Sequence, residues 1–420
     1  MPLEYLEELA FVRSSASSMF NGRQLKELQS YEDRQELTRN AGDYPSRLFL
    51  IIKATRLCNL RCSYCRAWRE GRDQVLAFSH LLSVIAQAMR LPGIRDLHIV
   101  WHGGETTLLS RRYFERAIWL QEHFRIDDRK VGHAIQSNAT RIDEHWARFF
   151  RATGFSVGVS LDVDAESHDR SRQFPGGVGS YAATKAGLEA LAAAGVPHGL
   201  LAVIDASMIK AGAASLLENL SAHGVRSVGL LNALPSNESV DGQSYLDWES
   251  YVSFLRQVFA KWHSNPGNLS LRELESLFNI VKGSGSRLCI YQGGCMGQYL
   301  TIEPDGRVSA CDKYVGDPTH HFGDLCSESL FSILTVSAGL KRAREEAAEV
   351  LKRFSGCANF AYCRGGCPHD ARLNTRFGNP GAQCCGLSPL IDDMHHAASK
   401  ERDNGRDYDR SRRIREAEVG

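Results

Sequence analysis

Short apolar runs alternate with longer amphipathic segments from residue 46 to residue 232. Each apolar run has the length of a strand, and the segments between them repeat their apolar residues with helical spacing. Several of these segments end in glycine, which is a common helix stop. The expected strands are "RLFLIIKAT" (47–55), "DLHIVW" (96–101), "VGHAIQSN" (131–138), "FSVGVSLD" (155–162), "HGLLAVID" (198–205) and "VRSVGLLN" (225–232). The expected helices include "HLLSVIAQAMR", "RRYFERAIWLQEHF", "EHWARFFRATG", "YAATKAGLEALAAAG" and "ASLLENLSAHG".

This alternation predicts the fold class α/β. A repeated strand–helix–strand order implies a parallel sheet whose crossovers are right-handed. The pattern contains six such units, which is fewer than the roughly eight of a complete barrel. We therefore expect a partial (β/α)6 TIM-like barrel with its chemistry at the carboxyl ends of the strands.

The same pattern suggests how the chain divides into domains. Residues 1–45 are polar and lack clear periodicity, and residues 46–240 form the expected barrel. Two helical stretches in residues 241–286 indicate a bridge. Residues 287–395 are rich in Cys and Gly and short on periodicity, which is typical of a domain held by metal clusters. Residues 396–420 form a charged tail with almost no apolar residues.

Composition narrows the class of protein. The chain has 420 residues, of which 43% are hydrophobic, so it can build large cores in two or three domains. Its formal net charge of +1 gives no argument for a nucleic-acid partner. The N-terminus lacks the basic region of a secretory signal, and no apolar run approaches the ~20 residues of a membrane span. We expect a cytoplasmic protein without a membrane or nucleic-acid partner.

The cysteines are clustered. There are twelve of them, and none lies between Cys65 and Cys289. In a chain of this length without a secretory signal, clustered cysteines indicate metal ligands rather than disulfides.

The first cysteine group is the octapeptide "CNLRCSYC", which directly follows the first expected strand. Cys58, Cys62 and Cys65 have the spacing C-x3-C-x2-C. A structural zinc site takes four ligands, whereas a [4Fe–4S] cluster held by three cysteines leaves one iron for a small molecule. The spacing therefore favours a cluster with an open iron, and a zinc or other metal site is the alternative.

These residues, with Tyr64 before the third cysteine, resemble the signature of the radical S-adenosylmethionine (SAM) superfamily. The resemblance implies that SAM chelates the open iron through its amino and carboxylate groups. In that family an electron from the cluster cleaves SAM to a 5′-deoxyadenosyl radical, which abstracts a hydrogen atom from substrate. The cofactor supplies the difficult chemistry and the protein directs it.

The resemblance extends to "WHGGET" at the end of the second expected strand. Gly103 and Gly104 allow a close backbone approach, and Glu105 is similar to the glutamate of the family's GGE motif, which binds the amino group of SAM. The family usually has proline next, where this chain has Thr106.

Four further residues are expected near SAM. Ser160 resembles the residue that bonds the methionine part, and Arg172, twelve positions later, is the expected partner of its carboxylate. Asn138 is expected near SAM, with a strand-end cap as its alternative role, and Tyr64 is expected beside the adenine. The alternative for Arg172 is a solvated surface arginine.

The C-terminal cysteines resemble the SPASM extension, which holds auxiliary [4Fe–4S] clusters in radical SAM enzymes that modify peptides and proteins. The motif "TIEPDGRVSACDKY" predicts a hairpin that delivers Cys311. By the resemblance, one cluster has the ligands Cys289, Cys295, Cys311 and Cys367. A second, distal cluster has the ligands Cys357, Cys363 and one of Cys384 and Cys385. One or two auxiliary clusters are thus expected, with zinc as the alternative metal.

One ligand of the distal cluster is missing from the usual pattern, because Phe354 occupies the position of the family's first cysteine. The cluster could keep an open iron, which we favour. Alternatively, Cys326 or both Cys384 and Cys385 could complete it. The alternative role for Cys326 is a small buried hydrophobic residue.

Asp312 directly follows a predicted cluster ligand. In the anaerobic sulfatase-maturating enzymes, an aspartate after the matching cysteine is the candidate general base. A carboxylate there can take a proton from a substrate as its radical is oxidised. The alternative is a carboxylate that only orders its loop.

The resemblance covers about residues 46–395 and favours a maturase that oxidises or crosslinks side chains of a peptide, as in ribosomal peptide modification. It also implies an external one-electron donor such as flavodoxin or ferredoxin. The alternative is radical chemistry on a small molecule such as a sugar or nucleoside, with sulfur insertion from an incompletely ligated cluster as a variant. A non-enzymatic iron–sulfur protein is a third hypothesis, which the SAM-binding residues disfavour.

Overall fold

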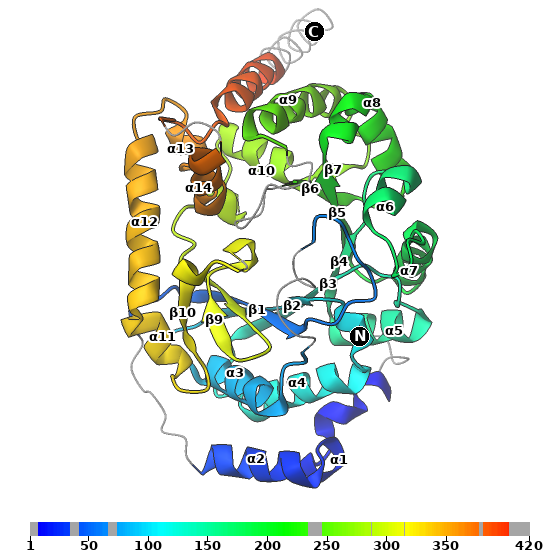
Figure 1. The fold of residues 1–420 in the computed structure, drawn as a ribbon, viewed down its shortest axis with the longest axis vertical. Helices are drawn as coiled ribbons and strands as arrows, with labels where there is room; N and C mark the ends of the chain where they lie inside the picture. The colour runs from blue at the N-terminus through cyan, green and yellow to red at the C-terminus, as the bar shows by residue number, and fades with distance from the viewer. Residues whose placement is uncertain are drawn as a thin grey trace, which may run out of the picture. The chain divides into compact units, whose positions relative to one another are not determined.

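The computed structural model describes residues 7–33, 42–65, 74–233, 246–286, 288–314, 316–377 and 381–402 (Figure 1). Contacts between residues divide the chain into two compact units. The first unit comprises Met1–Val203, Ser236–Gln243 and Gly294–Glu346. The second unit comprises Ile204–Pro235, Ser244–Gly293 and Ala347–Gly420.

The first unit begins with short helices that the sequence did not predict. They are η2 (Glu7–Arg13), α1 (Ala16–Met19) and α2 (Gly22–Glu32). Helix α2 begins at a capping box, in which the backbone N–H of Gln24 donates to the Asn21 side chain and the Asn21 N–H donates to the Gln24 side chain. Leu28 is the buried residue of α2. The apolar face was therefore too narrow to be seen as a period in the sequence.

Five parallel strands form the centre of the first unit, and the five predicted strands of this region agree with them to within two residues at each end. The neighbours β1 and β2, β2 and β3, β3 and β4, and β4 and β5 all pair in parallel. The strands are β1 (Arg47–Thr55), β2 (Asp96–Gly103), β3 (Lys130–Ser137), β4 (Ser156–Ser160) and β5 (His198–Ile204). Buried side chains alternate along β2 and along β1 as far as Ile52, as expected for strands of a sheet, and the last residues of β1 are all buried.

Helices follow the strands, as expected from the alternating pattern. They are α3 (Phe78–Arg90), α4 (Arg111–His123), α5 (Glu144–Thr153), α6 (Ala165–Ser171) and α7 (Tyr181–Ala193), with the short turn η3 (Thr106–Leu108) after β2. Helix α5 shows why these boundaries could be predicted. The Asp143 side chain accepts from the Trp146 N–H at its start, and Gly154 ends it in the left-handed conformation with a φ of 72°.

A hairpin from the far end of the sequence extends the same sheet beside β1. Strand β8 (Tyr299–Ile302) pairs in parallel with β1, and β9 (Arg307–Ser309) and β10 (His321–Asp324) continue antiparallel to it. Figure 1 shows β9 and β10 near β1, although the segments are far apart in the chain. The predicted hairpin before Cys311 is confirmed. The turns η5 (Asp312–Tyr314) and η6 (Pro318–His320) and helix α11 (Leu330–Val336) follow it.

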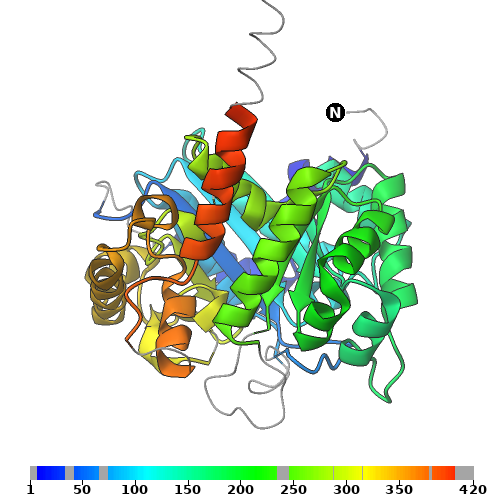
Figure 2. The same ribbon diagram turned by 90° about the horizontal axis from the view of Figure 1, so that it is seen from above.

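The second unit contains the sixth expected strand. Strand β6 (Ser227–Asn232) pairs in parallel with the short strand β7 (Ser270–Leu271). The helices of this unit include α8 (Ala206–Ala222), which is kinked at Gly212, and α9 (Trp248–Ser264) and α10 (Arg272–Val281), which match the two expected bridge helices. Figure 2 shows helix 388–402 in red beside α9, and the ion pair between Arg256 and Asp393 joins the two.

The cysteine-rich region is more helical than the sequence suggested. It contains η4 (Cys289–Tyr291), α12 (Ala338–Phe354), α13 (Phe360–Cys363) and α14 (Pro368–Phe377). Part of the predicted charged tail lies in helix 388–402, and residues 403–420 lie outside the described residues. The predicted domain boundaries stay a prediction.

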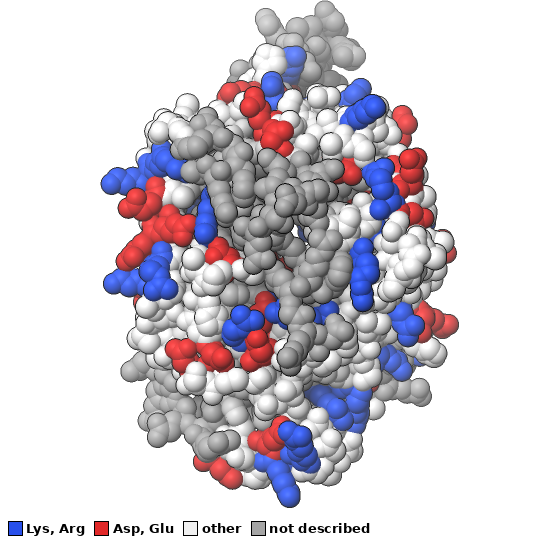
Figure 3. All heavy atoms as spheres, viewed as in Figure 1, with Lys and Arg blue, Asp and Glu red and all other residues white. Residues whose placement is uncertain are grey.

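The surface agrees with the small net charge. Figure 3 shows that Lys and Arg are interspersed with Asp and Glu over the face it draws. Within the described ranges, no helix is both long and apolar enough to cross a membrane.

Candidate functional site

The three N-terminal cysteines lie on one loop at the carboxyl end of β1. The Leu60 N–H donates to Cys58 Sγ at 3.4 Å, and the Cys65 N–H donates to the Cys62 carbonyl at 3.2 Å. The thiols are close enough to influence one another electrostatically. The structure therefore brings together the three residues that the sequence assigned to one cluster.

The chemistry of these thiols fits a bound cluster. Burial raises the pKa of the Cys58 thiol to about 12 and that of the Cys62 thiol to about 11. A thiolate in such surroundings needs a strong positive charge beside it, and a coordinated metal ion supplies one. Among the described residues, no group of three or more His, Cys, Asp or Glu side chains is spaced to hold a single ion. The fit rests on the donor chemistry and on the shared loop.

The GGE motif docks on the cysteine loop through its backbone. The Gly104 N–H donates to the Thr55 carbonyl and the Glu105 N–H donates to the Leu57 carbonyl, both at 2.7 Å. A Cβ atom on Gly104 would collide with the Leu57 carbonyl, and Gly103 has a φ of 120° that favours glycine. These glycines therefore allow the backbone of the GGE motif to lie close to the backbone of the segment that leads into the cysteine loop.

Glu105 is a buried carboxylate that ties β2 to the end of β3. Its Oε1 accepts from the Ser137 hydroxyl at 2.8 Å, and its Oε2 accepts from the Asn138 N–H at 2.8 Å. Thr107 donates to Oε1 through both its backbone and its hydroxyl. A carboxylate has about four acceptor positions, so Oε2 keeps room for a further donor. Binding of the SAM ammonium by Glu105 stays a prediction.

Asn138 fastens the end of β3 to the cysteine loop. Its Nδ2 donates to Asn59 Oδ1 at 3.0 Å, and its Oδ1 accepts from the Thr140 N–H at 3.0 Å. This geometry agrees with the strand-end alternative, and a contact with SAM stays a prediction. Ser160 lies on the neighbouring strand, where its Oγ accepts from Gln136 Nε2 at 2.8 Å.

Arg172 is buried, so the alternative of a solvated surface arginine is wrong. Its guanidinium forms a two-pronged ion pair with Asp162, at 2.9 Å from Nε and 3.3 Å from Nη2. Burial lowers the pKa of Arg172, but the charge of Asp162 raises it above its ordinary value. The predicted role of Arg172 toward the SAM carboxylate stays a prediction.

Asp162 is the site residue that sequence reasoning missed. Besides binding Arg172, it accepts from the Tyr64 hydroxyl at 2.7 Å and from the Val203 N–H at 3.1 Å. The signal was present, since an acid that follows Ser160 at the end of an apolar strand needs a partner when buried. Tyr64 is thus anchored through its hydroxyl, and its position beside adenine stays a prediction.

A second charged group lies where β1 meets the β8–β9 hairpin. Lys53 on β1 is 1% exposed, and its Nζ lies 2.9 Å from Glu303 Oε1 and 3.2 Å from Asp312 Oδ1. Arg56 Nη2 lies 2.6 Å from Glu303 Oε2. Two cations therefore balance two carboxylates, of which Asp312 is the more exposed.

Asp312 is held in its ionised form by these neighbours. Burial raises the pKa of Asp312, but the charges of Lys53 and His102 together lower it by more. The pKa of Asp312 therefore lies below its ordinary value. His102 Nδ1 lies 3.8 Å from Asp312 Oδ2, and His102 precedes the two glycines of the GGE motif. Asp312 thus lies at the carboxyl ends of β1 and β2, as do the cysteine loop and the GGE motif.

The predicted ligands of the first auxiliary cluster belong to both units. Cys295 and Cys311 lie in the first unit, and Cys289 and Cys367 lie in the second. This ligand set stays a prediction.

The remaining C-terminal cysteines form one group within the second unit. The Cys385 thiol donates to Cys363 Sγ at 3.4 Å, and the Cys384 thiol is hydrogen-bonded to Cys385 and Cys357. The hydrogen bond with Cys385 lowers the pKa of the Cys384 thiol to about 5. The adjacent pair therefore joins the group together, which supports a four-cysteine set over the open distal cluster that we expected.

Phe354 does not replace a ligand in this group but fills the core. It is 2% exposed, lies in the last turn of α12, and packs within reach of Gly365.

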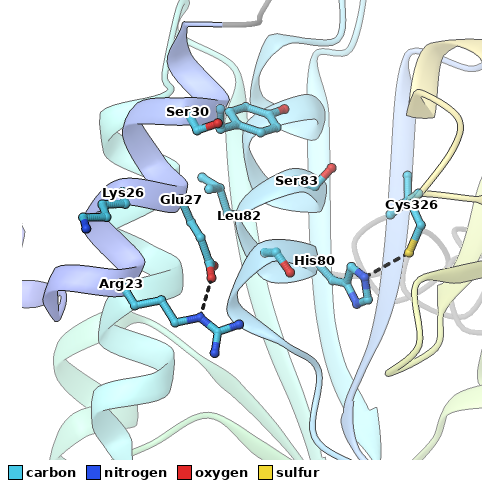
Figure 4. Close-up of a pocket in the computed structure, with 11 residues that line it drawn as sticks. Arg23, Lys26, Glu27, Ser30, His80, Leu82, Ser83 and Cys326 are labelled. Atoms are coloured by element: carbon cyan, nitrogen blue, oxygen red, sulfur yellow. Dashed lines mark hydrogen bonds and ion pairs between the residues drawn. The ribbon is translucent and has the colours of Figure 1, made fainter.

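Cys326 is exposed, so the alternative of a buried hydrophobic residue is wrong. It lies in the first unit, and its Sγ is 3.0 Å from His80 Nε2. Both residues line a cavity of about 770 Å³ between α2, α3 and the segment after β10 (Figure 4). Arg23 and Glu27, paired at 3.0 Å, line the opposite wall. Cys326 thus has its partner His80 within the first unit.

Two family models match the parts of the chain that carry these groups. Residues 52–208 match the Radical SAM superfamily, and residues 289–368 match SPASM, an iron–sulfur cluster-binding domain. The first match contains the cysteine loop, the GGE motif and Arg172. The second begins at Cys289 and ends just after Cys367.

Curated relatives are similar over most of the chain. A serine-type anaerobic sulfatase-maturating enzyme from Klebsiella aerogenes is 26% identical over 77% of this chain and 79% of its own length. A cysteine-type anaerobic sulfatase-maturating enzyme from Clostridium novyi is 27% identical over 77% of this chain and 88% of its own length.

Solved structures share the fold. Native anSMEcpe with bound AdoMet and Cp18Cys peptide has a TM-score of 0.73 at 23% identity, over 85% of this chain and 98% of that chain. Streptococcus suis SuiB bound to its precursor peptide SuiA has a TM-score of 0.56 at 16% identity, over 83% of this chain and 75% of that chain. The predicted fold class, a TIM-like α/β barrel followed by a SPASM domain, is confirmed.

These matches also confirm the cofactors: SAM, a [4Fe–4S] cluster that binds it, and auxiliary [4Fe–4S] clusters in the SPASM domain. The described residues fit the first cluster through three thiols on one loop, of which Cys62 is buried. The chain is a radical SAM iron–sulfur enzyme with a C-terminal SPASM domain.

Proposed function

We propose that this enzyme is a maturase that oxidises or crosslinks a side chain of a peptide or protein, with Ser, Cys and aromatic residues as the candidate targets. The relatives from Klebsiella aerogenes and Clostridium novyi, which act in sulfatase maturation by their names, support this class of substrate. The structure of SuiB with a precursor peptide gives a second example on the same fold.

The observation that carries the proposal is the position and charge of Asp312. Its side chain is 33% exposed, whereas that of Lys53 is 2% exposed, so the carboxylate can be reached while its counter-charge stays buried. Oδ1 faces Lys53 and Oδ2 faces His102. A carboxylate fixed in this way is ionised at neutral pH and can accept a proton without moving.

When bound, the cluster and SAM supply a 5′-deoxyadenosyl radical that takes one hydrogen atom from the substrate. In the proposal, Asp312 accepts the proton of the substrate hydroxyl or thiol as the substrate radical loses an electron, which an auxiliary cluster of the SPASM domain would accept. The oxidised side chain is then lighter by a pair of hydrogen atoms. Because the pKa of Asp312 is lowered, the protonated acid returns its proton to water readily. An external donor such as flavodoxin or ferredoxin delivers the electron that starts each cycle.

The test uses the holoenzyme under anaerobic conditions with SAM, reductant and peptides that carry a central Ser, Cys or aromatic residue, including any short peptide encoded beside this gene. We expect mass spectrometry to show a peptide that has lost a pair of hydrogen atoms. The variant Asp312→Asn should form about 10²- to 10⁴-fold less product while still cleaving SAM, because general-base catalysis contributes a factor of this size.

The matched control is Asp305→Asn on the same hairpin, where the partly exposed Asp305 is paired with Arg307. It should leave product formation unchanged. Full activity of Asp312→Asn would remove Asp312 from the proposal. If no peptide of the set changes mass while SAM is cleaved, the peptide class itself is wrong.

The argument for radical chemistry on a small molecule was an incompletely ligated distal cluster, and the arrangement of the C-terminal cysteines weakens that argument. Sulfur insertion was motivated by an incompletely ligated distal cluster, and the Cys384–Cys385 pair offers two thiols at that position. We therefore propose the peptide maturase alone.

A further inference from the structure

The cysteine loop is bonded along its backbone to the segment that contains Arg172. The Arg61 N–H donates to the Gln173 carbonyl at 2.7 Å, and the Ser63 N–H donates to the Ser171 carbonyl at 2.9 Å. The two segments run in opposite directions, because the partners fall from Gln173 to Ser171 as the loop rises from Arg61 to Ser63. Cys62 is consequently opposite Arg172, at the kind of position where side chains come closest.

The Arg172 side chain is fixed toward this position by two residues. Asp162, which is 1% exposed, takes the Nε and Nη2 atoms of the guanidinium. Tyr64, two residues after Cys62, stacks beneath the guanidinium with its ring centre 5.2 Å from Cζ. A guanidinium has five N–H donors, so the ion pair leaves others to be used.

The sulfur of Cys62 accepts a hydrogen bond from the Arg172 guanidinium. This side-chain hydrogen bond acts in addition to the interaction of the Arg172 charge with that sulfur. Arg172 thus contacts the sulfur of a cluster ligand in the structure that the chain adopts by itself. This contact is separate from the predicted contact with the SAM carboxylate.

We propose that Arg172, oriented by Asp162, donates a hydrogen bond to the Cys62 sulfur and thereby raises the reduction potential of the SAM-binding cluster. Hydrogen bonds to cluster sulfurs are among the factors that set the potential of an iron–sulfur cluster. Reduction adds negative charge to the cluster and its thiolates, so a donor at the sulfur stabilises the reduced form. Arg172 and Asp162 are positioning residues in this role, because they act on the cluster through its ligand.

The pairing with Asp162 also determines how the effect can be measured. Since the ion pair has no net charge, the double variant Asp162→Asn with Arg172→Gln removes the donor to Cys62 without a change in net charge. It also avoids leaving a single buried charge, which would be strongly destabilising. The matched control is Arg170→Gln, which removes an exposed cation two residues away.

The experiment is an anaerobic redox titration followed by EPR on the holoenzyme in the absence of SAM. The signal of the SAM-binding cluster is identified as the one that is missing in Cys58→Ala. We expect the midpoint of this signal to be more negative in the double variant than in the wild type. Arg170→Gln should shift the midpoint less, because it removes an exposed charge and leaves the hydrogen bond to Cys62 in place.

The proposal is overturned if the double variant retains the cluster with an unchanged or less negative midpoint. That result would leave Arg172 with a role toward SAM only, which would appear as weaker SAM binding. If the double variant loses the cluster, the midpoint of the SAM-binding cluster is measured in the single variant Arg172→Gln and compared with that in Arg170→Gln. A shift larger than that of Arg170→Gln supports the proposal, and a shift of equal size overturns it.

Discussion

The two cysteine groups of this enzyme are held in different ways. Cys58, Cys62 and Cys65 depend on neighbours from several strands, including a buried carboxylate and a buried ion pair. In the second unit, Cys357, Cys363, Cys384 and Cys385 lie against one another.

The difference follows from what each group has to hold. A cluster with three protein ligands keeps one iron for SAM, so the loop cannot be closed by a fourth thiolate and has to be ordered from outside. Four thiols can close around a cluster by themselves. They then need only backbone support, such as the Gly386 N–H that donates to Cys384 Sγ at 3.3 Å.

The largest effect that tests this comparison is the loss of the distal cluster. If four cysteines close it, Cys384→Ser and Cys385→Ser should each lose up to about four irons per chain, because each removes a ligand of a [4Fe–4S] cluster. Iron analysis after anaerobic reconstitution measures this. The control Cys326→Ser should retain the full iron content, since Cys326 pairs with His80. Full iron in Cys385→Ser would restore the open distal cluster.

The next effect concerns the buried charges of the first unit. Glu303→Gln removes the carboxylate that pairs with Lys53 and Arg56, whose side chains are at most 8% exposed. Breaking a buried ion pair costs about 3–5 kcal/mol of unfolding free energy, which urea unfolding would detect.

The matched control is the exposed pair of the second unit. Asp393→Asn breaks the bond to Arg256, where both side chains are well exposed, and should cost less than about 1 kcal/mol. Equal losses in the two variants would show that the first unit does not depend on its buried charges.

A smaller effect should appear as pH dependence. Burial lowers the pKa of His133 on β3 to about 4, and its ring accepts from Trp101 Nε1 at 3.2 Å. The folded state therefore binds fewer protons than the unfolded state between about pH 4 and the ordinary histidine pKa of about 6.5. The free energy of unfolding is fully retained above about pH 6.5 and should fall by up to ~1.4 kcal/mol per pH unit below it. Urea unfolding at several pH values measures this slope, and His133→Gln should reduce it. An unchanged slope in the variant would mean that His133 is not its source.

Local signals predicted most of the barrel. The apolar run from Arg47 to Thr55 gives β1 with the predicted bounds, and Gly154 ends α5 as expected. Strong periodicity and glycine stops act within one element, so they can be read without knowledge of the fold. Helix α12 was missed because the glycines and cysteines around it dominate the composition of that region.

The cysteine positions were predicted by the family resemblance, but their surroundings were not. The contact between Lys53 and Asp312 joins residues that are far apart in the sequence, and the pairing of β8 with β1 brings them together. Asp162 shows the same limit, since its partners Tyr64 and Arg172 are selected by the fold. Charges that compensate each other after folding leave no periodic signal in a sequence.

The most direct test of the three-ligand cluster is the EPR spectrum of the reduced, reconstituted enzyme with and without SAM. The account predicts that SAM changes the spectrum of the wild type, because SAM binds the iron that lacks a protein ligand. The triple variant of Cys58, Cys62 and Cys65 to Ala should keep the auxiliary signals and lose the response to SAM together with 5′-deoxyadenosine formation. A SAM-dependent change that persists in the triple variant would contradict the assignment of the open cluster to this loop.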